Sequence, residues 1–345
     1  MRKYLLASAG LTGIMVAACC GAQAASYIPV PLAPGAATQT AFAINNSNII
    51  AGAFKDSVGV EHGFVGPLDG SNYTVFDSPV DRHTGTEPRY LGDKGTINGF
   101  AAKSGYQIGV EFFRHPNGNF INFKTAPHTP MDGVVQGINN SNYSVGDYFN
   151  SDGIRMGFVG RHGVYKHDFD LNVQNYTRNS PRGIKDDNTT VAGLYDDQDG
   201  VEHGFVQVGS NLSVVDYPSD AAFGTVLEDI NNSGLATGQW TDSGGNPHGF
   251  IIDTTSGDVT DLDPGDGSTF QQAWGINEQG LAALSTSAGQ SYIYCPLPDS
   301  ECPSGGVHAI VHKKHVPSGA MLHYDRFGRT GHGHPLKVAK KGAVQ

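Results

Sequence analysis

The sequence is poor in charge and in long apolar runs, and each shortage excludes a class of protein. Only 16 % of the 345 residues are charged, with 22 Lys and Arg against 33 Asp and Glu. The net charge of −11 argues against a nucleic-acid partner, because phosphate binding depends on clustered Lys and Arg. Beyond the first 25 residues no stretch is apolar enough to span a bilayer. We therefore expect a mature chain without a transmembrane helix.

Glycine and small polar residues are abundant instead. The chain has 47 Gly, while hydrophobic residues make up 38 % and aromatic residues 10 %, which is too much for a disordered protein. Gly follows no period of three, so a collagen-like helix is excluded. Gly, Asn, Asp, Ser and Thr stand between short apolar runs, which is typical of strands joined by tight turns. The composition predicts an all-β protein.

Residues 1–25 have the features of an export signal. Arg2 and Lys3 precede an uncharged apolar stretch, and Ala22-Gln23-Ala24 is a small-x-small cleavage site. A competing site, Val16-Ala17-Ala18-Cys19, is similar to the bacterial lipobox and would leave Cys19 as a lipidated amino terminus. Both sites predict a secreted, periplasmic or cell-surface protein, and the choice between Ala24 and Cys19 stays open.

Cleavage near Ala24 would leave two of the four cysteines, Cys295 and Cys302. An even pair of cysteines in an exported protein usually forms a disulfide. Two thiolates alone do not supply the four ligands of a structural zinc site. We predict a disulfide that closes this short loop.

The middle of the chain repeats one motif at a regular interval. Ile-Asn-Asn-Ser occurs three times, and three further units carry looser copies of it. The first residues of these motifs, called anchors below, are Ile44, Leu91, Ile138, Ile184, Ile230 and Ile276, spaced 46 or 47 residues apart. Gly follows eight residues after four anchors and nine after a fifth, and Gly-Phe follows further on in four units.

Each unit has room for four short strands, as in a propeller blade. Six units over residues 26–302 predict a six-bladed β-propeller. The last unit has only three strands, ending near Tyr294, whereas the segment from Ser26 to Pro31 resembles a fourth strand without the other three. Pairing between the two would close the ring and remove two exposed edges.

This layout resembles the bacterial HAF-type extracellular repeat, with Ile-Asn-x-x-Gly, then Gly, then His-Ala-Phe, in which Gly here replaces the middle Ala. The resemblance covers most of residues 41–302. It implies an exported repeat protein with a β-propeller fold. It implies no particular reaction, since members of the family mostly lack an assigned activity.

Residues 303–345 lack the repeat and differ in charge from the rest. They hold seven Lys and Arg against one Asp, a net charge of +6, so the remainder of the chain carries −17. They also hold six of the fourteen His. We expect a flexible tail, with metal capture by His or attraction to an anionic surface as alternatives.

One position in each unit varies while its neighbours repeat. Two residues before the anchors stand Phe42, Arg89, Gln136, Arg182, Glu228 and Trp274. The first strand of a blade lies nearest the axis, so these side chains are predicted to form an axial ring that binds a polar or acidic ligand. The alternative is that they fill the channel. In contrast, His62, His203 and His248 recur beside Gly-Phe and are predicted to be structural, hydrogen-bonded to a neighbouring unit.

Two acidic loops leave calcium open as a cofactor. Asp261, Asp263 and Asp266 stand in one loop, and residues 196–200 form the other. Neither matches the EF-hand loop, which needs a distal Glu. No other cofactor is indicated, since the sequence has no phosphate-binding loop, nucleophile elbow or His-Glu-x-x-His motif.

The sequence therefore predicts an exported, monomeric binding or surface-interaction module, with a glycan or a surface protein as partner. The loops between second and third strands share one face with the connections between units, and this face is the predicted binding face. An alternative is a polysaccharide lyase or hydrolase, with His128 or Tyr176 as general base and Arg89 or Arg182 neutralising a uronate. A structural envelope protein is the second alternative.

Overall fold

A computed structural model describes ten segments of the chain. They are residues 23–79, 85–103, 109–122, 133–217, 223–262, 270–298, 301–303, 307–311, 313–315 and 321–324. These residues form strands and turns and no helix. Cys19 and most of the predicted export signal lie outside them. Within the described segments no helix has the length and apolarity needed to cross a membrane.

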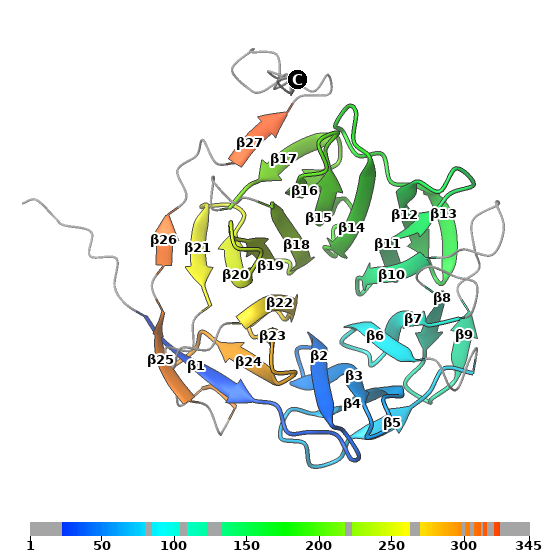
Figure 1. The fold of residues 1–345 in the computed structure, drawn as a ribbon, viewed down its shortest axis with the longest axis vertical. Coiled ribbons are helices and arrows are strands. Elements are labelled where there is room, and N and C mark those ends of the chain that lie inside the picture. The colour runs from blue at the N-terminus through cyan, green and yellow to red at the C-terminus, as the bar shows by residue number, and fades with distance from the viewer. Residues whose placement is uncertain are drawn as a thin grey trace, which may run out of the picture.

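The strands form five sheets arranged around a central axis, as in a β-propeller (Figure 1). The first sheet contains β2 (Thr38–Ile44), β3 (Ile49–Lys55), β4 (Glu61–Pro67) and β5 (Thr74–Phe76). The second contains β6 (Thr86–Leu91), β7 (Ile97–Ala101), β8 (Val110–Arg114) and β9 (Phe120–Asn122). The prediction of an all-β propeller is confirmed.

The largest sheet has nine strands. They are β10 (Gly133–Ile138), β11 (Tyr143–Phe149), β12 (Arg155–Arg161), β13 (Val164–Asp168), β14 (Arg178–Ile184), β15 (Thr190–Asp196), β16 (Glu202–Val208), β17 (Asn211–Val215) and β27 (Met321–Tyr324). Two units that the sequence separates therefore share one sheet, and the prediction of six separate sheets is not met. The link between them is a single parallel pair, Arg155 with Arg178.

The remaining two sheets have five strands each. One contains β18 (Thr225–Ile230), β19 (Leu235–Thr241), β20 (Pro247–Asp253), β21 (Asp258–Asp261) and β26 (Lys313–His315). The other contains β22 (Phe270–Ile276), β23 (Ala282–Thr286), β24 (Ser291–Cys295), β1 (Gln23–Pro29) and β25 (Val307–Val311). The strands nearest the axis are β2, β6, β10, β14, β18 and β22 (Figure 1).

The two ends of the propeller meet through β1. It pairs antiparallel with β24, from Ser26 opposite Cys295 to Pro29 opposite Tyr292, which is the predicted closure. Ile28 and Ile293 belong to one buried cluster together with apolar residues of the first unit, so the closure is also hydrophobic. Cys295 and Cys302 form the predicted disulfide, with the two Sγ atoms 2.03 Å apart.

The turn after each anchor explains why Asn and Gly recur there. The residue four positions after the anchor has a positive φ in every unit: Asn48 (56°), Gly95 (79°), Asn142 (59°), Asn188 (62°), Gly234 (95°) and Gly280 (81°). Only Gly and, less readily, Asn adopt this left-handed conformation at low cost. We call the end of the axis that carries these turns the turn face, and the opposite end, with the β3–β4 loop and its equivalents, the loop face.

Each innermost strand contains a β-bulge, and this bulge explains why Gly recurs at one position of the next strand in five of the units. Register shifts lie between Ala41 and Ala43, Pro88 and Tyr90, Val135 and Gly137, Pro181 and Gly183, Leu227 and Asp229, and Ala273 and Ile276. Just before the bulge, a backbone carbonyl oxygen of the innermost strand lies over a Gly of the next strand. In the fifth unit, the carbonyl oxygen of Val226 lies over Gly238, and a Cβ at Gly238 would overlap this oxygen. In the last unit the bulge spans two residues, and the equivalent position holds Leu284.

We predict that Gly238→Ala destabilises the fold by about 1–3 kcal/mol, because the added methyl group collides with the Val226 carbonyl and the Phe250 ring. Urea unfolding followed by fluorescence measures the change. Gly244→Ala is the matched control, since its Cβ would meet only the side chains of Asn246 and Asp242. Equal stability of the two variants would contradict the close approach.

Candidate functional site

The six bulge positions carry the six predicted ring residues. A bulge leaves its extra residue unpaired in the ladder and re-aims its side chain. Phe42, Arg89, Gln136, Arg182 and Glu228 are each the single extra residue of their bulge, and Trp274 is one of two. Five of the six line one small cavity at the axis, together with Tyr90, Asp229 and Gly275, and the sixth, Arg182, is bonded to Glu228. The structure thus brings the predicted ring together.

Arg89 lies between two aromatic rings. Its guanidinium carbon is 4.8 Å from the centre of the Phe42 ring and 5.0 Å from that of Trp274, and the two rings meet edge to face at 4.8 Å. One Nη of Arg89 contacts Glu87 at 2.6 Å. The other Nη and the Nε are buried and have no hydrogen-bond partner among the described residues. Arg89 thus lines the cavity with two buried guanidinium nitrogens left without an acceptor.

On the other side of the ring the charges are paired. Glu228 accepts hydrogen bonds from Arg182 and from Gln272, and its side chain is only 5 % exposed. Burial lowers the pKa of Arg182, but the charges of Glu228 and Asp147 outweigh it, so this pKa is raised. Arg182 is therefore held as a cation by its own neighbours, whereas Arg89 keeps two free donors.

Tyr90 and Asp229 separate this cavity from a second one towards the turn face. Both residues line both cavities, which have volumes of about 20 and 30 Å³. They stand one residue before their anchors, where the other units have only Ala or Gly. Asp229 accepts hydrogen bonds from the backbone N–H of Ile230 and of Ile276. These two hydrogen bonds lower the pKa of Asp229, but burial outweighs them and raises this pKa to about 7. The charges of Glu278 and Glu228 add to the rise.

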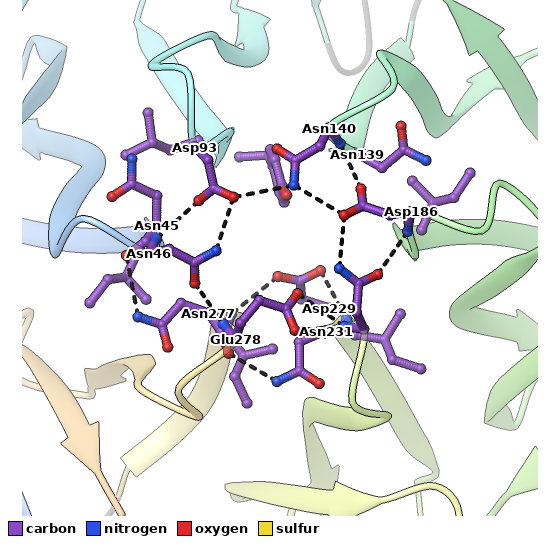
Figure 2. A pocket seen from close by; sticks show the side chains of 17 residues that line it. Asn45, Asn46, Asp93, Asn139, Asn140, Asp186, Asp229, Asn231, Asn277 and Glu278 are labelled. Atoms are coloured by element: carbon purple, nitrogen blue, oxygen red, sulfur yellow. Dashed lines mark hydrogen bonds between the residues drawn. The ribbon is translucent and has the colours of Figure 1, made fainter. Parts of the chain in front are cut away.

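The turn face of the axis is encircled by alternating amides and carboxylates. The residues two positions after the anchors are Asn46, Asp93, Asn140, Asp186, Asn232 and Glu278. Hydrogen bonds join each to the next, for example from the Asn46 amide to Asp93 at 2.9 Å and from the Asn140 amide to Asp93 at 3.2 Å and Asp186 at 3.1 Å. The last link runs from the Glu278 backbone N–H to the Asn46 side chain at 2.9 Å. Figure 2 shows the resulting belt around the axis.

The Asn directly after the anchor adds a second set of links between units. Its amide oxygen accepts backbone N–H groups of its own turn, as Asn45 does from Ser47 and Ile49. Its NH₂ donates to a backbone carbonyl one unit further on, as Asn231 does to Asn277 at 2.9 Å and Asn277 to Asn45 at 3.2 Å. The Asn-Asn motif therefore joins units in addition to forming a turn.

The sequence interpretation missed this belt. It assigned the Asn residues to turns alone, although aligning the units by their anchors shows that amide and acid alternate. Alternation avoids placing two carboxylates side by side. Asp93 and Asp186 accept hydrogen bonds from both neighbouring amides, whereas the Glu278 carboxylate accepts from the backbone N–H of Asn232. Burial raises the pKa of Asp186, but hydrogen bonds from Asn140 and Asn232 outweigh it and leave this pKa below its usual value.

The recurring histidines bind within their own unit, so the predicted bonds to a neighbouring unit are wrong. The His62 Nδ1 lies 2.7 Å from Asp77 and its Nε2 3.5 Å from Asp56. His203 repeats this pattern with Asp216 and Asp197, and His248 lies 3.1 Å from Asp242. Each imidazole also packs on an aromatic ring, as on Trp240 at 4.3 Å for His248. The third and fourth strands lie beside each other, so the nearest carboxylates come from the same unit.

Of the remaining candidate residues, the two that the structure describes, Tyr176 and Asp261, are not among the residues that line the two axial cavities. Tyr176 packs against the buried cluster that contains Leu171 and Phe205. Asp261 accepts a hydrogen bond from the Tyr217 hydroxyl at 2.9 Å on β21. His128, Asp263 and Asp266 lie outside the described residues, so the enzymatic and calcium hypotheses stay predictions. Among the side chains that the structure describes, no group of three His, Cys, Asp or Glu is arranged to hold a metal ion.

Comparison with known proteins gives no family for this chain. No protein-family model matches the sequence, and no curated protein is similar to it. Solved structures with similar folds include TolB from Acinetobacter baumannii, at 10 % identity over 84 % of this chain and 66 % of TolB, with a TM-score of 0.44. The β-propeller domain of the Trilobed protease from Pyrococcus furiosus shares 8 % identity over 74 % of this chain and 82 % of that one, at a TM-score of 0.42. The β-propeller domain of Cps50 (Swd1) from Myceliophteria thermophila shares 9 % identity over 78 % of this chain and 99 % of that domain, at a TM-score of 0.39.

We predict that Asp229→Asn stabilises the protein near pH 8 but changes little near pH 4. The folded state holds the Asp229 proton up to about pH 7, whereas the unfolded chain loses it near pH 4. Wild-type stability therefore falls as the pH rises through this window, and the neutral Asn removes that loss. Urea unfolding at both pH values measures the difference, and an equal effect at the two would contradict an axial carboxyl of raised pKa.

The contacts of His62 with Asp77 and Asp56 predict that the stability of the fold depends on pH. Burial lowers the pKa of His62, but its bonds to Asp77 and Asp56 outweigh it and raise this pKa above 6.5. The resulting stabilisation is present below pH 6.5 and is lost as the pH rises through the folded-state pKa. His62→Gln should thus cost up to about 1 kcal/mol at pH 5.5 and less at pH 9, measured by urea unfolding. A larger loss at pH 9 would contradict this assignment.

Proposed function

We propose that this chain is an exported six-bladed β-propeller of the HAF-repeat type that acts as a binding module, with its ligand site at the axis. The two four-strand sets of the nine-stranded sheet, β10–β13 and β14–β17, then count as separate blades, since one backbone pair links them. The belt supports this count, because it has six members and returns from Glu278 to Asn46.

The observation that carries the proposal is the state of Arg89. A buried guanidinium donor without an acceptor costs on the order of 1–3 kcal/mol. Arg114, Arg178 and Arg182 each leave one such nitrogen, whereas Arg89 leaves two, and Arg89 lines the axial cavity. The side chains around it differ from unit to unit, although the neighbouring positions repeat. The packing of a repeated fold does not require these side chains to differ. Binding of a ligand that lacks sixfold symmetry does require different side chains around the axis.

The cavity limits what can bind. Its volume of about 20 Å³ holds one water molecule or one functional group, so only the tip of a ligand enters it. A guanidinium donates best to a carboxylate, and the Arg89 guanidinium is held over the rings of Phe42 and Trp274. The turn face carries the belt, which leaves the loop face as the approach. We therefore favour a ligand that presents a carboxylate or a hydroxyl group, such as a uronate-containing glycan.

Binding of the purified chain from Ala25 onward to uronate-containing and neutral glycans tests the proposal by calorimetry. We expect saturable binding of a uronate glycan, weakened at least about tenfold by Arg89→Gln, since a lost charge-assisted bond costs about 1.5–3 kcal/mol. Arg89→Lys keeps the charge but loses the two-pronged geometry and should bind weakly too.

Lys166→Gln is the control, since it removes an exposed cation on β13 outside the axial ring. Thermal unfolding of each variant shows whether it is folded. Unchanged affinity in folded Arg89→Gln, or no saturable binding by the wild-type chain, would contradict an axial carboxylate site. New reducing ends or unsaturated products in the same mixtures would support the enzymatic alternative instead.

A further inference from the structure

Three strands that follow the disulfide in the sequence, β25 (Val307–Val311), β26 (Lys313–His315) and β27 (Met321–Tyr324), lie at outer edges of the propeller sheets. β25 pairs with β1, β26 with β21 and β27 with β17, all antiparallel. Figure 1 shows β25, β26 and β27 on the outer rim of the propeller, beside β1, β21 and β17. Each adds one strand to an edge that would otherwise end its sheet. The corresponding outer strands β5, β9 and β13 have no such addition among the described strands.

The first of these pairings places the closing strand between two partners. The strand order is β24, β1, β25, so β1 has a neighbour on each side. Its inner edge pairs over Ser26–Pro29 and its outer edge over Gln23–Tyr27. Cleavage at Ala24 would still leave three outer pairs, from Ala25 opposite Ala309 to Tyr27 opposite Val307. The disulfide of Cys295 and Cys302 fixes the start of the returning chain beside the end of β24.

Charge favours the same arrangement. The segment from residue 303 onward has a net charge of +6, and the rest of the chain has −17. The strand Asp258–Asp261 begins and ends with a carboxylate, and its partner, Lys313–His315, consists of basic residues. In the register, Asp258 stands opposite His315, and Val259 stands opposite Lys314. Opposite charges on paired strands stabilise a sheet, and outer edges without a partner invite association between molecules.

We propose that β25, β26 and β27 act as a strap that completes the ring closure from outside and covers three outer edges of the acidic body. β1 is then held by backbone pairing on both sides and cannot leave without breaking both. This role is independent of the ligand site at the axis. It assigns the carboxy-terminal segment a part in the fold, where the sequence predicted a flexible tail.

Cross-linking tests the register in the full chain. Ala25→Cys with Ala309→Cys places two thiols at directly paired positions, whereas Ala25→Cys with Ile310→Cys is one residue out of register. After mild oxidation, peptide mapping should find the first bond in most molecules and at least about fivefold less of the second. Equal yields of the two bonds, or neither bond in a folded protein, would overturn the strap.

Hydrogen exchange measures the hold on β1. Ala309→Pro removes a backbone donor within β25 and should speed amide exchange of the peptide that contains β1 at least about tenfold. Ala339→Pro is the control, since it lies in the same segment beyond the three strands and should leave that peptide unchanged. Exchange of β1 that is the same in both variants would overturn the proposed closure.

Discussion

The extra residue in each innermost strand is the constraint on which the rest of the structure depends. Without the bulge, successive side chains of the innermost strand would point alternately to its two faces. With the bulge, one residue per unit leaves the ladder and turns towards the axis. The same local change brings a backbone carbonyl over the neighbouring strand, which is why Gly238 and its equivalents have no room for a side chain. The bulge thus explains both the close packing of the first two strands of a unit and the identity of the side chains at the axis.

Two rings of polar contacts act at different depths of the axis. At the turn face the belt links unit to unit through hydrogen bonds, which Asp93 and Asp186 accept from both sides and Glu278 accepts from Asn232, so the charge of each carboxylate is compensated locally. Further along the axis from the turn face, the charges of the ring formed by the bulge residues are paired unevenly. Arg182 is paired with Glu228, whereas Arg89 keeps two nitrogens without acceptors. The belt therefore accounts for cohesion, whereas in the ring Arg89 leaves two guanidinium nitrogens without an acceptor and Arg182 leaves only its Nε. This asymmetry is the reason to place a ligand at Arg89.

The fold and the ring were predictable because they depend on residue spacing, and spacing is visible in a repeat. The closing segment, predicted from Ser26 to Pro31, the cysteine pair and the six positions before the anchors all follow from counting. The bulges were not predictable, because a bulge is a backbone event and the residues at it, from Phe42 to Trp274, share no type. The bonds of His62 depend on which strands are adjacent. The belt could have been found, since Asn46 and Asp93 begin an alternation that runs through all six units.

The most direct test of closure around the axis is a double-mutant cycle between Phe42 and Trp274. Their rings meet at 4.8 Å although 232 residues separate them in the sequence. Phe42→Leu and Trp274→Leu, singly and together, should show a coupling of about 0.5–1.5 kcal/mol in the free energy of unfolding. Phe42→Leu with Phe205→Leu, on strands that do not touch, should be additive. Additivity of Phe42 and Trp274 as well would contradict a ring in which the first and last units meet at the axis.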